Sequence, residues 1–94
     1  MGLTFDIRYH QDVVRKDIPA LSSSAKQRIR EAVEAKLTTH PEQFGKPLRK
    51  SLKGYRKLRV GDHRVIFRIE ERLVFVLMIQ HRSTVYEQAE KRSL

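Results

Sequence analysis

Nine lysines and arginines lie between residues 46 and 68, with a single acid, Asp62, among them. Such a concentration of cations suits the binding of a polyanion, because ammonium and guanidinium groups contact phosphates favourably. The alternative for a basic run is a solvated surface without a ligand. The spacing of the cations along the predicted strands decides between the two interpretations. The cations are Lys46, Arg49, Lys50, Lys53, Arg56, Lys57, Arg59, Arg64 and Arg68.

Three segments rich in Val, Ile and Phe, at 55–60, 63–70 and 73–80, carry most of this charge and read as strands. The two-residue connections between them, Gly61-Asp62 and Glu71-Arg72, predict successive antiparallel hairpins. Glycine at the first central position suits a type II′ turn, whereas Glu71-Arg72 contains no preferred turn residue.

With both turns in place, alternation assigns every strand residue to one of two sheet faces. In this register Arg59 lies opposite Arg64, Ile66 opposite Leu77, and Arg64 opposite Ile79. The predicted core face carries Leu58, Val60, Val65, Phe67, Ile69, Val74, Val76 and Met78, with His63 and Arg56 near its margins. The other face, called the basic face below, carries Tyr55, Lys57, Arg59, Arg64 and Arg68 beside an apolar strip of Phe75, Leu77 and Ile79.

The opposition of Arg59 and Arg64 favours a ligand over a solvated surface. Like charges directly opposite each other destabilise a sheet by roughly 0.2–1 kcal/mol. Folding gains nothing from this pair, and the predicted basic face contains no acid, so an anion that bridges the cations is the simplest explanation. The apolar strip predicts a second occupant, either stacked bases or an apolar segment of a partner.

Length and composition limit the remaining possibilities. Ninety-four residues predict one domain spanning 1–94, and the net charge of +9 falls mainly on residues 46–94, where thirteen Lys and Arg stand against five Asp and Glu. The absence of cysteine excludes disulfides and thiolate metal sites. No apolar run reaches the ~20 residues of a membrane span, and the first residues show no leader pattern, so we expect a soluble, cytoplasmic protein.

The rest of the chain predicts an α+β fold in which a helical hairpin covers the core face. Pro19 ends or bends the first helix, and Ser22–Ser24 offer caps for the second. In the last helix Val85, Ala89 and Arg92 share one stripe. The expected elements are a strand at 3–9, helices at 12–21 and 24–38, a loop at 41–54, the three strands above and a helix at 82–94.

Three segments of the second half carry a family resemblance, and their joint occurrence is specific: LRKSLKG at 48–54, YRKLRVGDHRVIFRIE at 55–70 and VLMIQHRSTVYEQA at 76–89. Together they resemble the RelE/ParE superfamily of toxins from toxin–antitoxin pairs, most closely its RelE-like branch. The resemblance implies an N-terminal strand and a helical hairpin on a four-stranded antiparallel sheet. It also implies cleavage of mRNA in the ribosomal A site, by attack of the 2′-hydroxyl, with no metal and no cofactor.

The resemblance places Arg64, Arg82, Tyr86 and Lys57 on functional positions of the family, and the chemistry of RNA cleavage suggests the following roles. Arg64 and Arg59 hold the scissile phosphate, Arg82 stabilises the transition state or the leaving oxygen, and Tyr86 stacks on a base or orients the 2′-hydroxyl. Lys57 is the candidate base, a role that requires its neighbours to favour the neutral amine. Two positions depart from the pattern, since Tyr55 stands where some members have a second lysine and His63 where tyrosine is common. The further expected RNA contacts are Lys50, Lys53, Arg56, Arg59, Arg68 and His81.

Two of the four histidines, His63 and His81, lie next to arginines of the expected site. His63 is assigned to packing on the core side, and His81 to the basic face beside Arg82. The histidines are scattered, so no metal site is expected.

The expected partners are a cognate antitoxin that lies on the apolar strip and neutralises the arginines, the ribosome and mRNA. No membrane is expected among them, and DNA only through the antitoxin complex. Two alternatives remain, a ParE-like inhibitor of DNA gyrase and a non-catalytic module that binds RNA or the ribosome.

Overall fold

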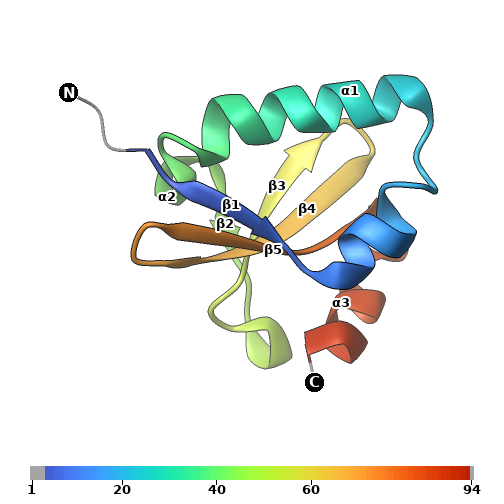
Figure 1. The fold of residues 1–94 in the computed structure, drawn as a ribbon. Coiled ribbons are helices and arrows are strands. Elements are labelled where there is room, and N and C mark those ends of the chain that lie inside the picture. The colour runs from blue at the N-terminus through green and yellow to red at the C-terminus, as the bar shows by residue number, and fades with distance from the viewer. Residues whose placement is uncertain (1–3, 94) are drawn as a thin grey trace.

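The computed structural model describes residues 4–93, and a five-stranded sheet lies at its centre (Figure 1). Its strands are β1 (Asp6–Tyr9), β2 (Lys46–Pro47), β3 (Arg56–Val60), β4 (His63–Glu70) and β5 (Leu73–His81). They lie in the order β1-β5-β4-β3-β2. β1 runs parallel to β5, whereas all other neighbours are antiparallel.

The predicted α+β class is confirmed, and the sheet differs in two details from the four antiparallel strands expected. The N-terminal strand joins the edge of β5 in parallel. β2 forms within the expected loop, because the backbone bond from Leu48 N to Tyr55 O (2.9 Å) folds residues 46–47 back against β3.

Helical segments cover the sheet: η1 (Val13–Asp17), α1 (Ser23–Ala32), η2 (Val33–Leu37), α2 (Pro41–Phe44), η3 (Lys50–Leu52) and α3 (Val85–Ser93). α1 continues directly into η2, and the Ser22 hydroxyl accepts a hydrogen bond from Ala25 N (3.2 Å), which confirms the predicted cap. In Figure 1, α1 lies on one side of the sheet and α3 on the other. No helix within residues 4–93 combines the length and apolar character needed to cross a membrane.

Both predicted hairpins are confirmed. Arg59 lies opposite Arg64 and Val60 opposite His63, and Gly61 in the turn has a φ of 60°. The second turn is also in place although it lacks a glycine, because Glu71 itself adopts a φ of 53°. Left-handed backbone of this kind is less costly for glycine than for glutamate.

A β-bulge makes the predicted register of β5 wrong beyond Val76. Phe67 lies opposite Val76, but Ile66 lies opposite Met78 and Arg64 opposite Gln80, so Leu77 is an extra residue on β5. One inserted residue reverses which face the following side chains occupy. Ile79 and His81 therefore lie on the side covered by α1, and Met78 on the opposite side.

The expected exposed apolar strip is absent from the part of the chain that the structure describes, because the bulge turns Ile79 to the other face and α3 covers Leu77. Leu77 and Ile79 are each only 2% exposed. Ile79 belongs to the core beneath α1 and η2, whereas Leu77 belongs to a second core under α3. The second core contains Leu52, Ile66, Leu77, Met78, Val85 and Ala89.

Candidate functional site

Cations from three neighbouring strands share one pocket. Lys57 and Arg59 extend from β3, Arg64 from β4 and Lys46 from β2, and together with Phe44 they line a cavity of about 190 Å³. Lys46 lies directly opposite Lys57, and Arg59 directly opposite Arg64, so like charges face each other on both sides of β3. We call these four cations the cationic corner. Its repulsion is relieved when an anion binds between them.

Arg64 is held in place without being neutralised. Its Nη1 donates to the carbonyls of Gly61 (3.0 Å) and His63 (2.9 Å) at the β3–β4 turn. No carboxylate among residues 4–93 forms an ion pair with Arg64. A guanidinium carries five N–H donors, so the side chain keeps both its charge and unused donors for a ligand.

Arg82 is attached to the same turn. Its backbone N–H donates to Asp62 O (2.8 Å), and its side chain is exposed. Arg64 and Arg82, expected to act together, are therefore tied to adjacent residues of one turn. The structure thus brings the two arginines to the same end of the sheet.

Tyr86 joins Lys57 across the basic face. The Lys57 ammonium lies 5.4 Å from the centre of the Tyr86 ring, although one residue belongs to β3 and the other to α3. Such a contact between a cation and an aromatic face is attractive and fixes their mutual position. Of the four residues expected to be catalytic, Lys57 and Arg64 line the cationic corner, Tyr86 contacts Lys57, and Arg82 is bonded through its backbone to the turn that holds Arg64.

Arg68 differs from the expectation. Its Nη1 donates to the Tyr55 hydroxyl (2.9 Å), and its guanidinium lies 4.8 Å from the centre of the Phe75 ring. Glu70 Oε1 lies 2.6 Å from Arg68 Nε, close enough for an ion pair, although the angle at the nitrogen does not make a hydrogen bond. The prediction that the basic face contains no acid is therefore wrong, and Arg68 is already occupied by its neighbours.

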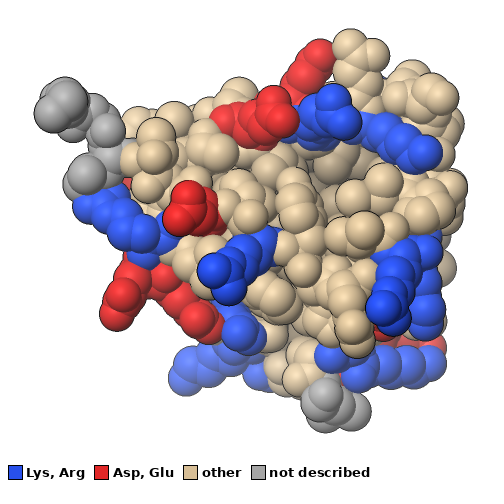
Figure 2. Space-filling model, viewed as in Figure 1, with Lys and Arg blue, Asp and Glu red and all other residues tan. Residues whose placement is uncertain are grey.

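Three other expected RNA contacts lie apart from the pocket. Arg56 points to the opposite side of the sheet, where its Nη1 donates to the carbonyls of Gly45 (3.0 Å) and Glu42 (3.4 Å). Lys50 and Lys53 are exposed, at the start of η3 and just after its end. On the face of the molecule drawn in Figure 2, basic side chains gather mainly along the lower and right-hand edges.

His81 does not lie on the basic face, because the bulge places it opposite His63. The two rings are 6.0 Å apart and nearly perpendicular, and His81 Nδ1 accepts a hydrogen bond from Ser83 N (3.1 Å). Burial, with help from His81 and Arg28 and against the influence of Asp62, lowers the pKa of His63. Within residues 4–93, no three side chains of His, Asp or Glu are grouped so as to hold a metal ion.

The ion pair between Asp17 and Arg92 was not predicted from the sequence, and it is the most buried of the ion pairs among the described residues. A signal for it was present. Asp17 stands four residues from both Val13 and Leu21 on the apolar stripe of the first helix, and Arg92 continues the stripe of Val85 and Ala89. A charge on a buried stripe indicates that it needs a partner of opposite charge, but the stripe does not say which residue that partner is.

Comparison with known proteins identifies the family of this chain. Residues 6–86 match the family described as ParE toxin of the type II toxin-antitoxin system parDE. Toxin RelG of Mycobacterium tuberculosis is 31% identical over 74 residues, which cover 77% of this chain and 85% of that protein. Toxin RelE of the same organism is 33% identical over 73 residues, or 76% of this chain and 75% of that protein.

Solved structures show the same fold. The toxin–antitoxin complex RelBE2 from M. tuberculosis contains a chain that matches with a TM-score of 0.77 and 28% identity, covering 84% of this chain and 99% of that one. A mutant of the E. coli toxin RelE in the free state matches with a TM-score of 0.72 and 20% identity, covering 97% and 99%. The chain therefore belongs to the RelE/ParE superfamily, in its RelE-like branch, and is the toxin of a type II toxin–antitoxin system.

Proposed function

We propose that this toxin is a ribosome-dependent endoribonuclease that cuts mRNA in the A site. The observation that carries the proposal is the cationic corner, where Lys57, Arg59 and Arg64 line one pocket with no carboxylate of residues 4–93 paired to them. A phosphodiester placed there gains charge-assisted hydrogen bonds and removes the repulsion between the cations.

The reaction would be an attack of the 2′-hydroxyl on the adjacent phosphorus. The O2′–P bond forms and the P–O5′ bond breaks, which leaves a 2′,3′-cyclic phosphate and a 5′-hydroxyl. Arg59 and Arg64 hold the phosphate, and Arg82 stabilises the charge that develops on it or on the leaving oxygen. No metal ion is needed for these steps, because fixed cations supply the electrostatic stabilisation.

Lys57 and Tyr86 complete the site. Tyr86 is half-buried beside the pocket and can orient the 2′-hydroxyl or stack on a base. Lys57 is the candidate acceptor of the 2′-hydroxyl proton. Its place beside Arg59 and Arg64 in the pocket, and its contact with the Tyr86 ring, also support a role as a phosphate ligand.

The cationic corner also indicates how activity is restrained. The M. tuberculosis relative was solved as a toxin–antitoxin complex, and we propose that this toxin likewise has a cognate antitoxin. Because Leu77 and Ile79 are buried, the antitoxin cannot lie on them as expected. We therefore place its inhibitory contact on the cations of the corner. Carboxylates of the antitoxin would neutralise Arg59 and Arg64 and exclude RNA.

The experiment is cleavage of a defined mRNA on programmed ribosomes by the purified toxin. We expect one cut in the A-site codon, no cut when the attacking nucleotide carries a 2′-deoxyribose, and no cut in the same mRNA without ribosomes. Equal cleavage of the deoxy-substituted mRNA would contradict the mechanism. Unchanged mRNA in all samples would contradict the proposed activity.

An inhibitor of DNA gyrase is the second candidate, because the matching family is described as ParE toxin. The same preparation is therefore added to a supercoiling assay. Loss of supercoiling with intact ribosome-bound mRNA would replace the first proposal with the second. Binding of ribosomes without either effect would indicate a non-catalytic module.

A further inference from the structure

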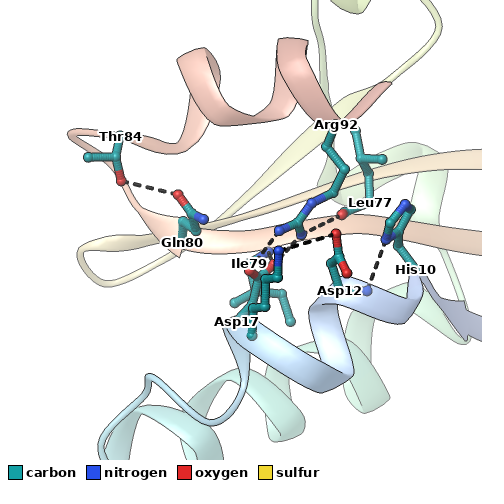
Figure 3. Close-up of polar contacts among 9 residues, drawn as sticks. His10, Asp12, Asp17, Leu77, Ile79, Gln80, Thr84 and Arg92 are labelled. Atoms are coloured by element: carbon teal, nitrogen blue, oxygen red, sulfur yellow. Dashed lines mark hydrogen bonds and ion pairs between the residues drawn. The ribbon is translucent and has the colours of Figure 1, made fainter. Parts of the chain in front are cut away.

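A buried ion pair joins the beginning of the chain to its last helix (Figure 3). Arg92 Nη1 donates to Asp17 Oδ2 (2.7 Å) and Nη2 to Asp17 Oδ1 (3.1 Å), so the contact is bidentate between residues 75 positions apart. The Asp17 side chain is 1% exposed and the Arg92 side chain 10%. We call this pair the clamp.

The clamp is tied to β5 at the bulge. Asp17 Oδ2 also accepts a hydrogen bond from Ile79 N (2.9 Å), and Arg92 Nη1 also donates to Leu77 O (3.1 Å). Leu77 is the extra residue that has no partner on β4. The bulge thus supplies a carbonyl for Arg92, and the carboxylate supplies the acceptor that Ile79 would otherwise find on a neighbouring strand.

Stability alone does not explain such a pair. Removing two charges from water costs several kcal/mol per ion, and apolar side chains of similar volume often stabilise a fold equally well. The clamp differs from an apolar contact in being directional, since the guanidinium fork and the carboxylate allow one arrangement. It therefore fixes where α3 lies rather than only that it is bound.

α3 needs such an anchor. Its buried residues are the small apolar Val85 and Ala89, and only residues 82–84 connect it to β5. Arg92 holds the last turn, while Tyr86, in the first turn, meets Lys57. Tyr86 and Arg92 are six positions apart, or about 9 Å along a rigid helix. If Arg92 no longer holds the last turn, α3 can rotate. Such a rotation moves Tyr86 relative to the cationic corner.

We propose that Asp17 and Arg92 are positioning residues of the site: the clamp sets the position of Tyr86 over Lys57 and thereby the rate of cleavage. The effect of the clamp on the rate of cleavage rests on the proposed nuclease function. Its effect on the position of Tyr86 does not, because that position can be measured in the free protein. Neither residue of the clamp contacts RNA in this proposal.

The test variant replaces both charges, Asp17→Asn together with Arg92→Met. The amide oxygen keeps an acceptor for Ile79 N–H, and the flexible thioether fills the space without leaving a lone buried charge. The matched control is Lys91→Met, because Lys91 is the neighbouring residue on α3 and forms only an exposed ion pair with Glu87 (3.7 Å). Arg92→Lys, which keeps the charge but loses the fork, provides the comparison if the double variant does not fold.

The positional readout is ¹⁹F NMR of protein containing 3-fluorotyrosine. The chain has three tyrosines, and the Tyr86 signal is identified by its loss in Tyr86→Phe. We expect the Tyr86 signal to shift or broaden in the double variant and, less strongly, in Arg92→Lys, and to stay in place in Lys91→Met. An unmoved Tyr86 signal in a folded clamp variant would overturn the positional proposal.

The catalytic readout is ribosome-dependent cleavage under single-turnover conditions. We expect the maximal rate of the double variant to fall on the order of 10²-fold, with half-saturation unchanged, since misplacement of a positioned group acts on the chemical step. A moved Tyr86 signal with an undiminished rate would overturn the link to catalysis. If wild-type protein cleaves nothing, the proposed function fails, while the NMR comparison still decides the role of the clamp.

Discussion

Arg64 and Arg92 show two uses of the same side chain. Arg64 bonds to the carbonyls of Gly61 and His63, whereas Arg92 bonds to the carboxylate of Asp17. Carbonyl groups orient a guanidinium without cancelling its charge, but a carboxylate cancels it. Within the net charge of +9, the clamp contributes nothing because Asp17 and Arg92 cancel, whereas the cationic corner contributes four positive charges.

An arginine that is bonded only to carbonyl groups keeps its charge for a ligand, whereas an arginine paired with a carboxylate does not. At the corner, four cations repel one another at the surface, and the binding of a polyanion would relieve this repulsion. In the clamp, the charge of Arg92 is neutralised by Asp17, and the contact holds α3 in place. Variants at the clamp and at the corner should therefore differ in whether they change stability or activity.

Removing one partner of the clamp should destabilise the fold more than any change at the corner. Arg92→Ala leaves the Asp17 carboxylate buried without its cation, which typically costs about 3–5 kcal/mol. The free energy of unfolding from urea denaturation measures this loss. Lys91→Ala, at an exposed pair on the same helix, should change stability by no more than about 1 kcal/mol. Equal effects of the two variants would show that the clamp is no stronger than a surface contact.

Removing a cation at the corner should instead affect activity. Arg64→Ala and Arg82→Ala should each reduce A-site cleavage by about 2.7–4 kcal/mol of transition-state stabilisation, with unfolding midpoints close to wild type. Arg15→Ala, an exposed arginine on η1, is the matched control and should cleave normally. Full cleavage by both corner variants would refute the site.

The repulsion between Arg59 and Arg64 can be measured directly. Arg59→Gln should raise the free energy of unfolding by about 0.2–1 kcal/mol, because it removes a like charge directly opposite Arg64. The gain should shrink at high salt, where exposed charges are screened. Arg15→Gln should show neither effect. A loss of stability in Arg59→Gln at low salt would mean that the corner contains no strain for an anion to relieve.

The smallest effect concerns His63, the residue before Arg64. Its pKa is lowered below the usual 6.5 by burial, His81 and Arg28, so the unfolded chain binds the proton more readily. Stability should therefore decrease as the pH falls through 6.5 toward the native pKa, and His63→Gln should reduce this dependence. An NMR titration of the His63 ring gives the pKa itself. A midpoint at or above 6.5 would show that burial and the neighbouring His81 and Arg28 do not control the pKa of His63 in solution.

Much of the cationic corner could be predicted from the sequence. The turn at Gly61-Asp62 fixes the pairing of β3 with β4, and alternation then places Arg59 opposite Arg64 and Lys57 on the same face. The Ser22 cap and the continuous second helix follow from equally local signals. These predictions succeeded because each depends on residues that are close in the chain.

The bulge in β5 and the pairing of Arg92 could not be predicted from the sequence, because both depend on contacts between distant segments. An inserted residue in a strand leaves no mark on its apolar pattern, so Leu77 could not be recognised as a bulge, and with it the predicted sides of Met78, Ile79 and His81 were wrong. The partner of Arg92 lies 75 positions away, and no periodicity specifies a distance of that kind. Local patterns determine backbone angles and faces, whereas the pairing of two buried charges is determined only when packing brings their segments together.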